Sequence, residues 1–186
     1  MLTELHKEGI IAKGIHAIGH SLGAQILGYV GHHFIKLTNG QKIARITALD
    51  PAGPCFSDRP KEEQIRAGAA DYVEVYHCDD GFLGTKSRFG DIDFYMNKGF
   101  EQPQCELSFW KNLWILKPKI CSHKVCVAAW MSTVTHRERF PATQCDSYES
   151  FKQGKCSQNS KTIAGFSNPG TAKGTYYFST KEYEKF

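Results

Sequence analysis

The sequence predicts an α/β domain with a mostly parallel sheet, and two observations support that fold class. Segments with the apolar or alternating pattern of buried strands lie at residues 15–18, 44–50, 71–78 and 174–180, and helical patterns separate them. Strands that alternate with helices along a chain favour a parallel sheet. A length of 186 residues and a hydrophobic content of 41% fit one domain with its own core.

The first strand and the first long helix flank a serine. Ile15, Ala17 and Ile18 form a short apolar run without helical spacing, and Gly19 ends it, which predicts a strand. Apolar residues then recur at three- and four-residue steps, which predicts a helix that ends near Gly31. Ser21 lies at the junction between these two elements.

The residues around this serine, Gly19-His20-Ser21-Leu22-Gly23, match the pattern G-x-S-x-G. In that pattern the serine is a nucleophile exposed on a tight turn from a strand into a helix. We expect no room for a Cβ at either glycine, and we expect the Leu22 N–H to donate to an oxyanion. The alternative is a serine that only caps the helix.

Asp50 ends the second predicted strand, residues 44–50, and a Pro-Ala-Gly-Pro turn follows it. Because the carboxyl ends of parallel strands share one edge of a sheet, Asp50 is expected on the same edge as Ser21. The alternative is an aspartate that caps the turn at the following proline.

The seven cysteines indicate an oxidising compartment. Cys145 and Cys156 enclose a short polar loop, and Cys105 and Cys121 enclose a slightly longer one. Both are typical of disulfide loops in secreted proteins. Each closure is expected to stabilise the fold by about 3 kcal/mol.

Three other cysteines, Cys55, Cys78 and Cys126, leave at least one without a partner in this chain. Zinc binding by Cys121, His123 and Cys126 is an alternative use of the C-terminal cysteines. Nothing nearby completes a four-ligand set at the usual spacing, so no metal is expected.

Composition excludes several function classes. The net charge is +4 and the lysines are scattered, so nucleic-acid binding has little support. No stretch approaches the roughly 20 apolar residues of a transmembrane helix. The first ten residues lack the apolar block of a signal peptide and are typical of a short helix that precedes the first strand.

Several motifs occur together in one order: IGHSLGA, ITALDPAGPCF, YVEVYH, GFLG, DFY, the Gln-Pro pair before Cys105, and CSH at 121–123. In this set the chain resembles the pancreatic lipase superfamily, and most of all its secreted insect members. The resemblance runs from about residue 15 to the end. It implies an α/β-hydrolase fold, of which residues 1–186 form the C-terminal part of the catalytic domain, without the N-terminal strands.

The resemblance also implies a catalytic triad of Ser21, Asp50 and His123. In such a triad the histidine takes the serine proton while the hydroxyl attacks an ester carbonyl, and the aspartate orients and stabilises the imidazolium. An acyl-enzyme then hydrolyses. This chemistry needs no cofactor.

The segment between Cys105 and Cys121 lies where the family places its lid. Lysines surround aromatic and leucine side chains at helical spacing, as in a flap that contacts a lipid surface; these are Phe109, Trp110, Leu113 and Trp114. The alternative is a loop that buries its aromatic residues in the core.

The chain also departs from the family pattern. It has Gly90-Asp91 where relatives have Gly-His, Met96 where a proline is usual, and Val125-Cys126 where a small basic pair is usual. The family's N-terminal strands and its His-Gly loop, which supplies a second oxyanion donor, have no counterpart before Ile15.

The expected function is hydrolysis of lipid esters, as by an acylglycerol lipase, at a lipid surface outside the cell. A signal peptide is expected in the N-terminal part that precedes this chain. The alternatives are a phospholipase A1, a non-catalytic lipid-binding relative such as the yolk proteins, and a fragment that is inactive by itself. A zinc-stapled interaction module is a further alternative from another class.

Overall fold

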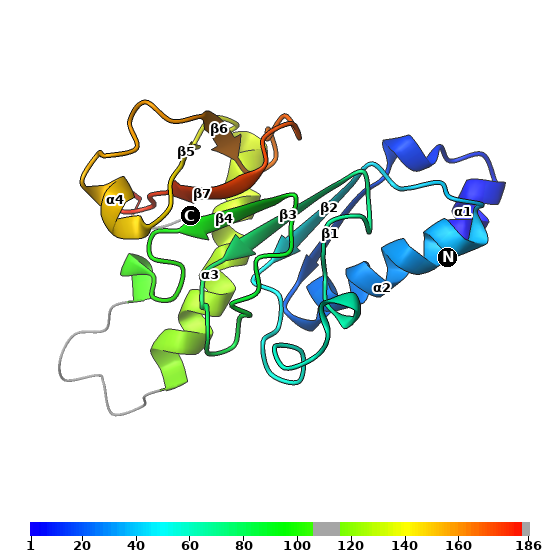
Figure 1. Cartoon of the computed structure of the whole chain (residues 1–186), viewed down its shortest axis with the longest axis horizontal. Coiled ribbons are helices and arrows are strands. Elements are labelled where there is room, and N and C mark those ends of the chain that lie inside the picture. Colours follow the sequence, from blue (N-terminus) through cyan, green and yellow to red (C-terminus); the bar gives the residue numbers. More distant parts are fainter. Residues whose placement is uncertain (106–115, 184–186) are drawn as a thin grey trace.

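The computed structural model describes residues 1–105 and 116–183, although not the side chains of residues 116–119. Its sheet has seven strands in the order β1-β2-β3-β4-β7-β5-β6 (Figure 1). The strands are β1 His16–His20, β2 Arg45–Leu49, β3 Tyr72–His77, β4 Ile92–Met96, β5 Phe140–Gln144, β6 Lys161–Ala164 and β7 Gly174–Phe178. The α-helices are α1 Leu2–Lys7, α2 Leu22–Leu37, α3 Leu116–Thr135 and α4 Tyr148–Lys152, and short 3₁₀ helices cover Ala12–Gly14, Lys61–Glu63 and Pro103–Cys105.

The sheet is mostly parallel, as predicted. Strands β1 to β4 and β7 run parallel, whereas β5 pairs antiparallel with both β6 and β7. Every residue of β3 and of β4 is buried, as expected of central strands covered on both faces. The fold is therefore the mixed α/β arrangement that the alternation of elements predicted.

Two hydrophobic cores cover the two faces of this sheet. Ala24 and Phe34 of α2 pack on one face, among apolar residues of β2 and β3. Trp130 of α3 packs on the other face, among aromatic residues of β3, β4 and β7. In Figure 1, α2 lies beside β1 at one end of the sheet, and β5 and β6 lie at the other end.

The prediction that α2 ends near Gly31 is wrong. The helix continues to Leu37, because Gly31 is a packing position and not a C-terminal cap. A Cβ at Gly31 would lie 2.2 Å from the backbone oxygen of Ala69, and one at Gly28 would lie 3.0 Å from Cα of Ile65. The glycines let α2 approach the 64–70 loop closely.

The four predicted strands appear with slightly different bounds, but β4, β5 and β6 were missed. Pro141 interrupts the strand signal in β5, since proline cannot donate to the ladder. Strand β6 is only four residues long. Such short segments carry little periodicity, so tertiary pairing decides them.

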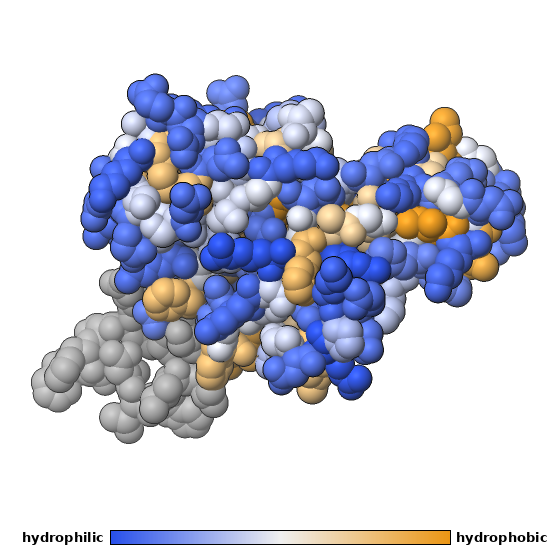
Figure 2. Space-filling view, in the orientation of Figure 1, coloured by the Kyte–Doolittle hydropathy of each residue, from blue (hydrophilic) through white to orange (hydrophobic). Residues whose placement is uncertain are grey.

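A few apolar side chains are exposed among hydrophilic ones over the end of the molecule formed by α1 and α2 (Figure 2). A cleft of about 870 Å³ lies there, lined by residues such as Met1, Val30 and Phe34. Ser21, Asp50 and His123 do not line it. Within the residues described, no helix combines the length and the hydrophobicity needed to cross a bilayer.

Candidate active site

Ser21 forms a tight turn between β1 and α2. Its backbone has φ 57° and ψ −123°, a conformation that a non-glycine residue rarely adopts. The Ser21 N–H donates to the Leu49 carbonyl at 3.0 Å, and the Ala52 N–H donates to the Ser21 carbonyl at 3.1 Å. These bonds hold the turn at the carboxyl ends of β1 and β2.

The side chain of Ser21 does not cap α2. Ser21 occupies the N-cap position, yet its side chain accepts no hydrogen bond from the first turn of the helix. A capping serine uses its hydroxyl in that way. The capping alternative therefore does not explain this serine.

The two glycines of the turn differ. A Cβ at Gly19 would lie 2.7 Å from the backbone oxygen of Gly23, so a side chain is excluded there, as expected. A Cβ at Gly23 would meet nothing within 4 Å, so the same expectation is wrong for Gly23. The backbone of residue 23 lies against the Cα of Gly19, so residue 19 must be glycine whereas residue 23 need not be.

Asp50 follows β2 and is fully buried. Its Oδ1 accepts hydrogen bonds from the backbone N–H groups of Cys78 at 2.8 Å and Asp79 at 3.0 Å. A Cβ at Gly84 would lie 2.5 Å from that same oxygen, so the 79–85 loop closes over the carboxylate. Charge-assisted hydrogen bonds of this kind orient a carboxylate and stabilise its ionised form.

The other carboxylate oxygen of Asp50 faces His123 on α3. Asp50 Oδ2 lies 2.6 Å from Nδ1 of His123, whose side chain is 9% exposed. Because an ionised carboxylate can only accept, Nδ1 carries the proton, and a neutral ring then keeps a lone pair at Nε2. The pair has the orientation that a general base requires.

His20 contacts the backbone and ring of the same histidine. The His20 Nε2–H donates to the His123 carbonyl at 3.0 Å, and the two ring centroids lie 4.3 Å apart. Burial lowers the pKa of His20, and the neighbouring His123 lowers it further. A neutral His20 therefore fills the space between the Ser21 turn and α3.

The structure brings two of the three predicted triad residues into contact. Asp50 and His123 are hydrogen-bonded, and Ser21 ends the neighbouring strand, but no hydrogen bond joins Ser21 Oγ to His123 among the described residues. Leu22 begins α2, where backbone N–H groups lack partners within the helix. The catalytic roles of Ser21, Asp50 and His123 and the oxyanion donor remain predictions. Phe109, Trp110, Leu113 and Trp114 lie outside the described residues.

Both predicted disulfides, Cys105–Cys121 and Cys145–Cys156, are confirmed. A third disulfide joins Cys78 to Cys126 and leaves Cys55 free and exposed. The zinc alternative is wrong, because Cys121 and Cys126 are both in disulfides. Asp50, Asp79 and His123 place possible ligand atoms within 4.8 Å of one another, but the contact of Asp50 with His123 already accounts for that closeness.

Sequence patterns did not reveal a second buried histidine near this site. His77 ends β3, and its Nε2 lies 2.9 Å from Oδ1 of Asp93 while its Nδ1 lies 3.2 Å from the Thr85 carbonyl. Burial lowers the pKa of His77, but the hydrogen bond and the charge of Asp93 outweigh burial, so the pKa is raised. The sequence signal that could have indicated this pair is the presence of the polar residues His77 and Asp93 in strands that are otherwise mostly apolar.

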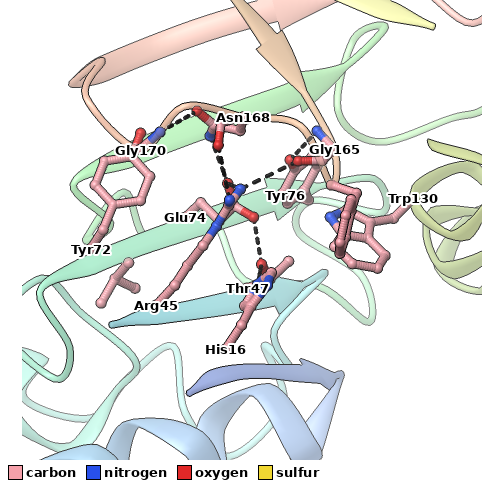
Figure 3. A network of polar contacts seen from close by, with 12 residues as sticks. His16, Arg45, Thr47, Tyr72, Glu74, Tyr76, Trp130, Gly165, Asn168 and Gly170 are labelled. Carbon is pink, nitrogen blue, oxygen red and sulfur yellow. Dashed lines mark hydrogen bonds and ion pairs between the residues drawn. The ribbon is translucent and has the colours of Figure 1, made fainter. Parts of the chain in front are cut away.

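A further buried network lies on the α3 face of the sheet (Figure 3). The Glu74 carboxylate accepts from Arg45 at 2.5 Å, from Asn168 at 2.6 Å and from the Thr47 hydroxyl. Arg45 also donates to the carbonyls of Gly165 and Asn168. The network ties the 165–170 loop to β2 and β3.

Comparison with known proteins places this geometry in a family. The family model described as Lipase matches residues 1–186. Lipase member H of Mus musculus is 37% identical over 182 residues, covering 98% of this chain and 38% of the relative. Lipase member H of Danio rerio is 38% identical, covering 84% and 33%. Phospholipase A1 member A of Homo sapiens is 36% identical, covering 83% and 32%.

The chain thus spans about a third of the length of these relatives. The match of the family model extends over the whole chain, including the Ser21 turn and the Asp50–His123 pair. The chain belongs to the lipase family.

Proposed function

We propose that this chain carries the catalytic residues of a secreted carboxylic ester hydrolase that acts on lipids, with Ser21 as nucleophile, His123 as base and Asp50 as the orienting acid. The observation that carries the proposal is the buried Asp50–His123 hydrogen bond at the sheet edge where the Ser21 turn lies. Membership of the lipase family supports it.

The mechanism follows from the roles of these three groups. Nε2 of His123 takes the Ser21 proton as Oγ attacks the ester carbonyl, and Asp50 stabilises the imidazolium that forms. The imidazolium then protonates the leaving alcohol, which leaves an acyl group on Ser21. Water, activated by His123, releases the fatty acid and restores the serine.

The Leu22 N–H is proposed to donate to the oxyanion of the tetrahedral intermediate. It is the first amide after the nucleophile, at the amino end of α2, where partial positive charge accumulates. One such donor typically contributes about 10²- to 10³-fold in turnover.

The proposed substrate is an acylglycerol. A phospholipid is the second candidate, because one of the matching relatives is named a phospholipase A1. Release of fatty acid from triacylglycerol emulsions and from phosphatidylcholine vesicles, measured side by side, separates the two. A faster rate on the phospholipid would replace the acylglycerol proposal.

The presence of serine, aspartate and histidine at the matching positions argues against a non-catalytic, yolk-protein-like relative. The three disulfides among the described cysteines fit an oxidising compartment and support secretion. Inactivity of residues 1–186 when expressed alone is the remaining alternative, and the labelling experiment below addresses it.

A serine-directed fluorophosphonate tests the nucleophile. We expect it to label the chain at Ser21, and Ser21→Ala to abolish labelling. Ser157→Ala is the matched control, because Ser157 is exposed outside the site, and it should label like the wild type. Equal labelling of the Ser21→Ala variant would refute the assignment, and no labelling of the wild type would favour an inactive chain.

Trp110 and Trp114 are proposed to contact the lipid surface. Replacing both with serine should lower hydrolysis of emulsified substrate far more than hydrolysis of a soluble short-chain ester. If both tryptophans are instead buried in the core, the double substitution should lower the free energy of unfolding by several kcal/mol and should reduce the rates on both substrates equally. Thermal melting together with the two assays distinguishes these outcomes.

A further inference from the structure

A disulfide connects the element that binds the candidate acid to the helix that carries the candidate base. Cys78 follows β3, and Cys126 lies on α3, 48 residues further along the chain. Both side chains are buried, at 0% and 2% exposure. Any displacement of α3 relative to the end of β3 must therefore strain a covalent link.

At one end, the disulfide holds a hydrogen-bond donor to the acid. The backbone N–H of Cys78 donates to Asp50 Oδ1 at 2.8 Å, and that of the next residue, Asp79, donates to the same oxygen. Cys78 thus forms the covalent link and also belongs to the cage around the Asp50 carboxylate, by which we mean the Cys78 and Asp79 N–H groups and the 79–85 loop.

At the other end, the disulfide fixes the base. Cys126 lies three residues after His123 on α3, and residues at this spacing share one face of a helix. The bond to Cys78 therefore sets both the distance and the rotation of α3 at the point where Nδ1 of His123 meets Asp50 Oδ2.

These contacts form a closed circuit from Asp50 to Cys78, across the disulfide to Cys126, along less than one helical turn to His123, and back to Asp50.

We propose that the Cys78–Cys126 disulfide is a positioning element that holds His123 on Asp50. Its catalytic meaning rests on the proposed function, whereas its effect on the Asp50–His123 contact can be measured without any substrate. A misplacement of about 1 Å in a catalytic constellation can cost about 10²-fold in rate. Loss of the link should therefore reduce reactivity while the substrate site remains.

The test compares two disulfide-deletion variants of the full chain. Cys78→Ala/Cys126→Ala removes the proposed positioning element, and Cys145→Ala/Cys156→Ala removes a disulfide that encloses a loop between β5 and β6. Three readouts are taken on each variant below its melting temperature: the rate of fluorophosphonate labelling, kcat and KM on a soluble p-nitrophenyl ester, and the downfield proton NMR resonance of His123 Nδ1–H.

We expect the Cys78/Cys126 variant to lose about 10- to 100-fold in labelling rate and kcat, with KM unchanged and the downfield resonance broadened or absent. The Cys145/Cys156 variant should keep its rates within about twofold of the wild type even where its melting temperature falls. Wild-type rates and an intact resonance in the first variant would overturn the proposal. So would equal rate losses in both variants.

A second variant keeps the test possible if Cys78→Ala/Cys126→Ala does not fold. Cys78→Ala/Cys126→Val restores buried volume without the covalent link, and it should show the same loss of rate and resonance while folded. If the wild type itself is not labelled, this chain is inactive by itself, and the His123 resonance still tests the link. Retention of that resonance in both Cys78/Cys126 variants overturns the inference alone.

Discussion

Two buried aspartate–histidine pairs lie near the carboxyl edge of the sheet in the described part of the chain, and they differ in how many ring nitrogens are hydrogen-bonded. In the Asp93–His77 pair, one ring nitrogen faces the carboxylate and the other faces the Thr85 carbonyl. Both partners are acceptors, which favours a doubly protonated ring, and the hydrogen bond and charge of Asp93 raise the pKa of His77. In the Asp50–His123 pair, only Nδ1 has a partner among the described residues.

The difference shows that a buried acid–histidine contact does not by itself identify a base. Both ring nitrogens of His77 face acceptors and the side chain is fully buried, whereas Nε2 of His123 has no hydrogen-bond partner among the described residues. His77 therefore has a structural role. Its contacts with Asp93 and with the Thr85 carbonyl connect β3 to β4 and to the loop that closes over Asp50. A functional histidine is distinguished by its unused nitrogen.

The largest expected effect comes from a change in the Asp50–His123 pair. Asp50→Asn should lower kcat by about 10³- to 10⁴-fold, because an amide donor facing Nδ1 selects the wrong tautomer and cannot stabilise the imidazolium. Steady-state kinetics on a soluble ester, or the labelling rate, measures the loss. An activity within tenfold of the wild type would remove Asp50 from the triad and end the distinction between the pairs.

A third buried carboxylate sharpens the comparison. Glu74 is fully buried and paired with Arg45 in the network of Figure 3, three residues before His77 on β3. Glu74→Gln should cost about 3–5 kcal/mol of unfolding free energy, because Arg45 loses its buried counter-charge. Urea denaturation measures this loss.

The rate per folded molecule should stay within a few-fold in Glu74→Gln, since this network does not contact Asp50 or His123 in the described structure. Exposed Glu62→Gln serves as the control for loss of one negative charge. A large loss of rate with unchanged stability would mean that the network acts on the site.

The smallest effect concerns the Asp93–His77 pair and depends on pH. Because the folded-state pKa of His77 is raised, its stabilising contribution is fully present below the unfolded value of about 6.5 and is lost as pH rises through the folded pKa. Asp93→Asn should cost about 1–3 kcal/mol at pH 6 and less at pH 9.

Urea unfolding of the wild type and of Asp93→Asn at both pH values provides the measurement, with exposed Asp58→Asn as the control. A stability difference that grows with pH would contradict a charged His77. It would also weaken the contrast between the two histidines.

Local sequence signals were sufficient for part of this molecule. The G-x-S-x-G pattern with an apolar run before it and helical spacing after it predicted the Ser21 turn, because turn chemistry depends on adjacent residues. The spacing of Cys145 and Cys156 predicted their disulfide for a related reason, since a short loop keeps its ends close. Asp50 was found from its place at the end of a strand.

His123 was identified by resemblance to a family and not by any local pattern. Cys-Ser-His, which lies within α3, has no spacing that indicates a base, and the contact of His123 with Asp50 spans 73 residues of sequence. The chain's path through the sheet brings the two together. Residue types alone also did not distinguish His77 from His123, because the number of acceptors around each ring depends on tertiary contacts.

The sequence by itself therefore determined the alternation of strands and helices, the Ser21 turn and the two short-range disulfides. The tertiary structure alone decided the continuation of α2 past Gly31, the cage around Asp50 and the pairing of Cys78 with Cys126. The physical reason is the range of the interactions. Periodicity and turn chemistry act between near neighbours along the chain, whereas packing against Ala69 and a link across 48 residues exist only once the sheet has formed.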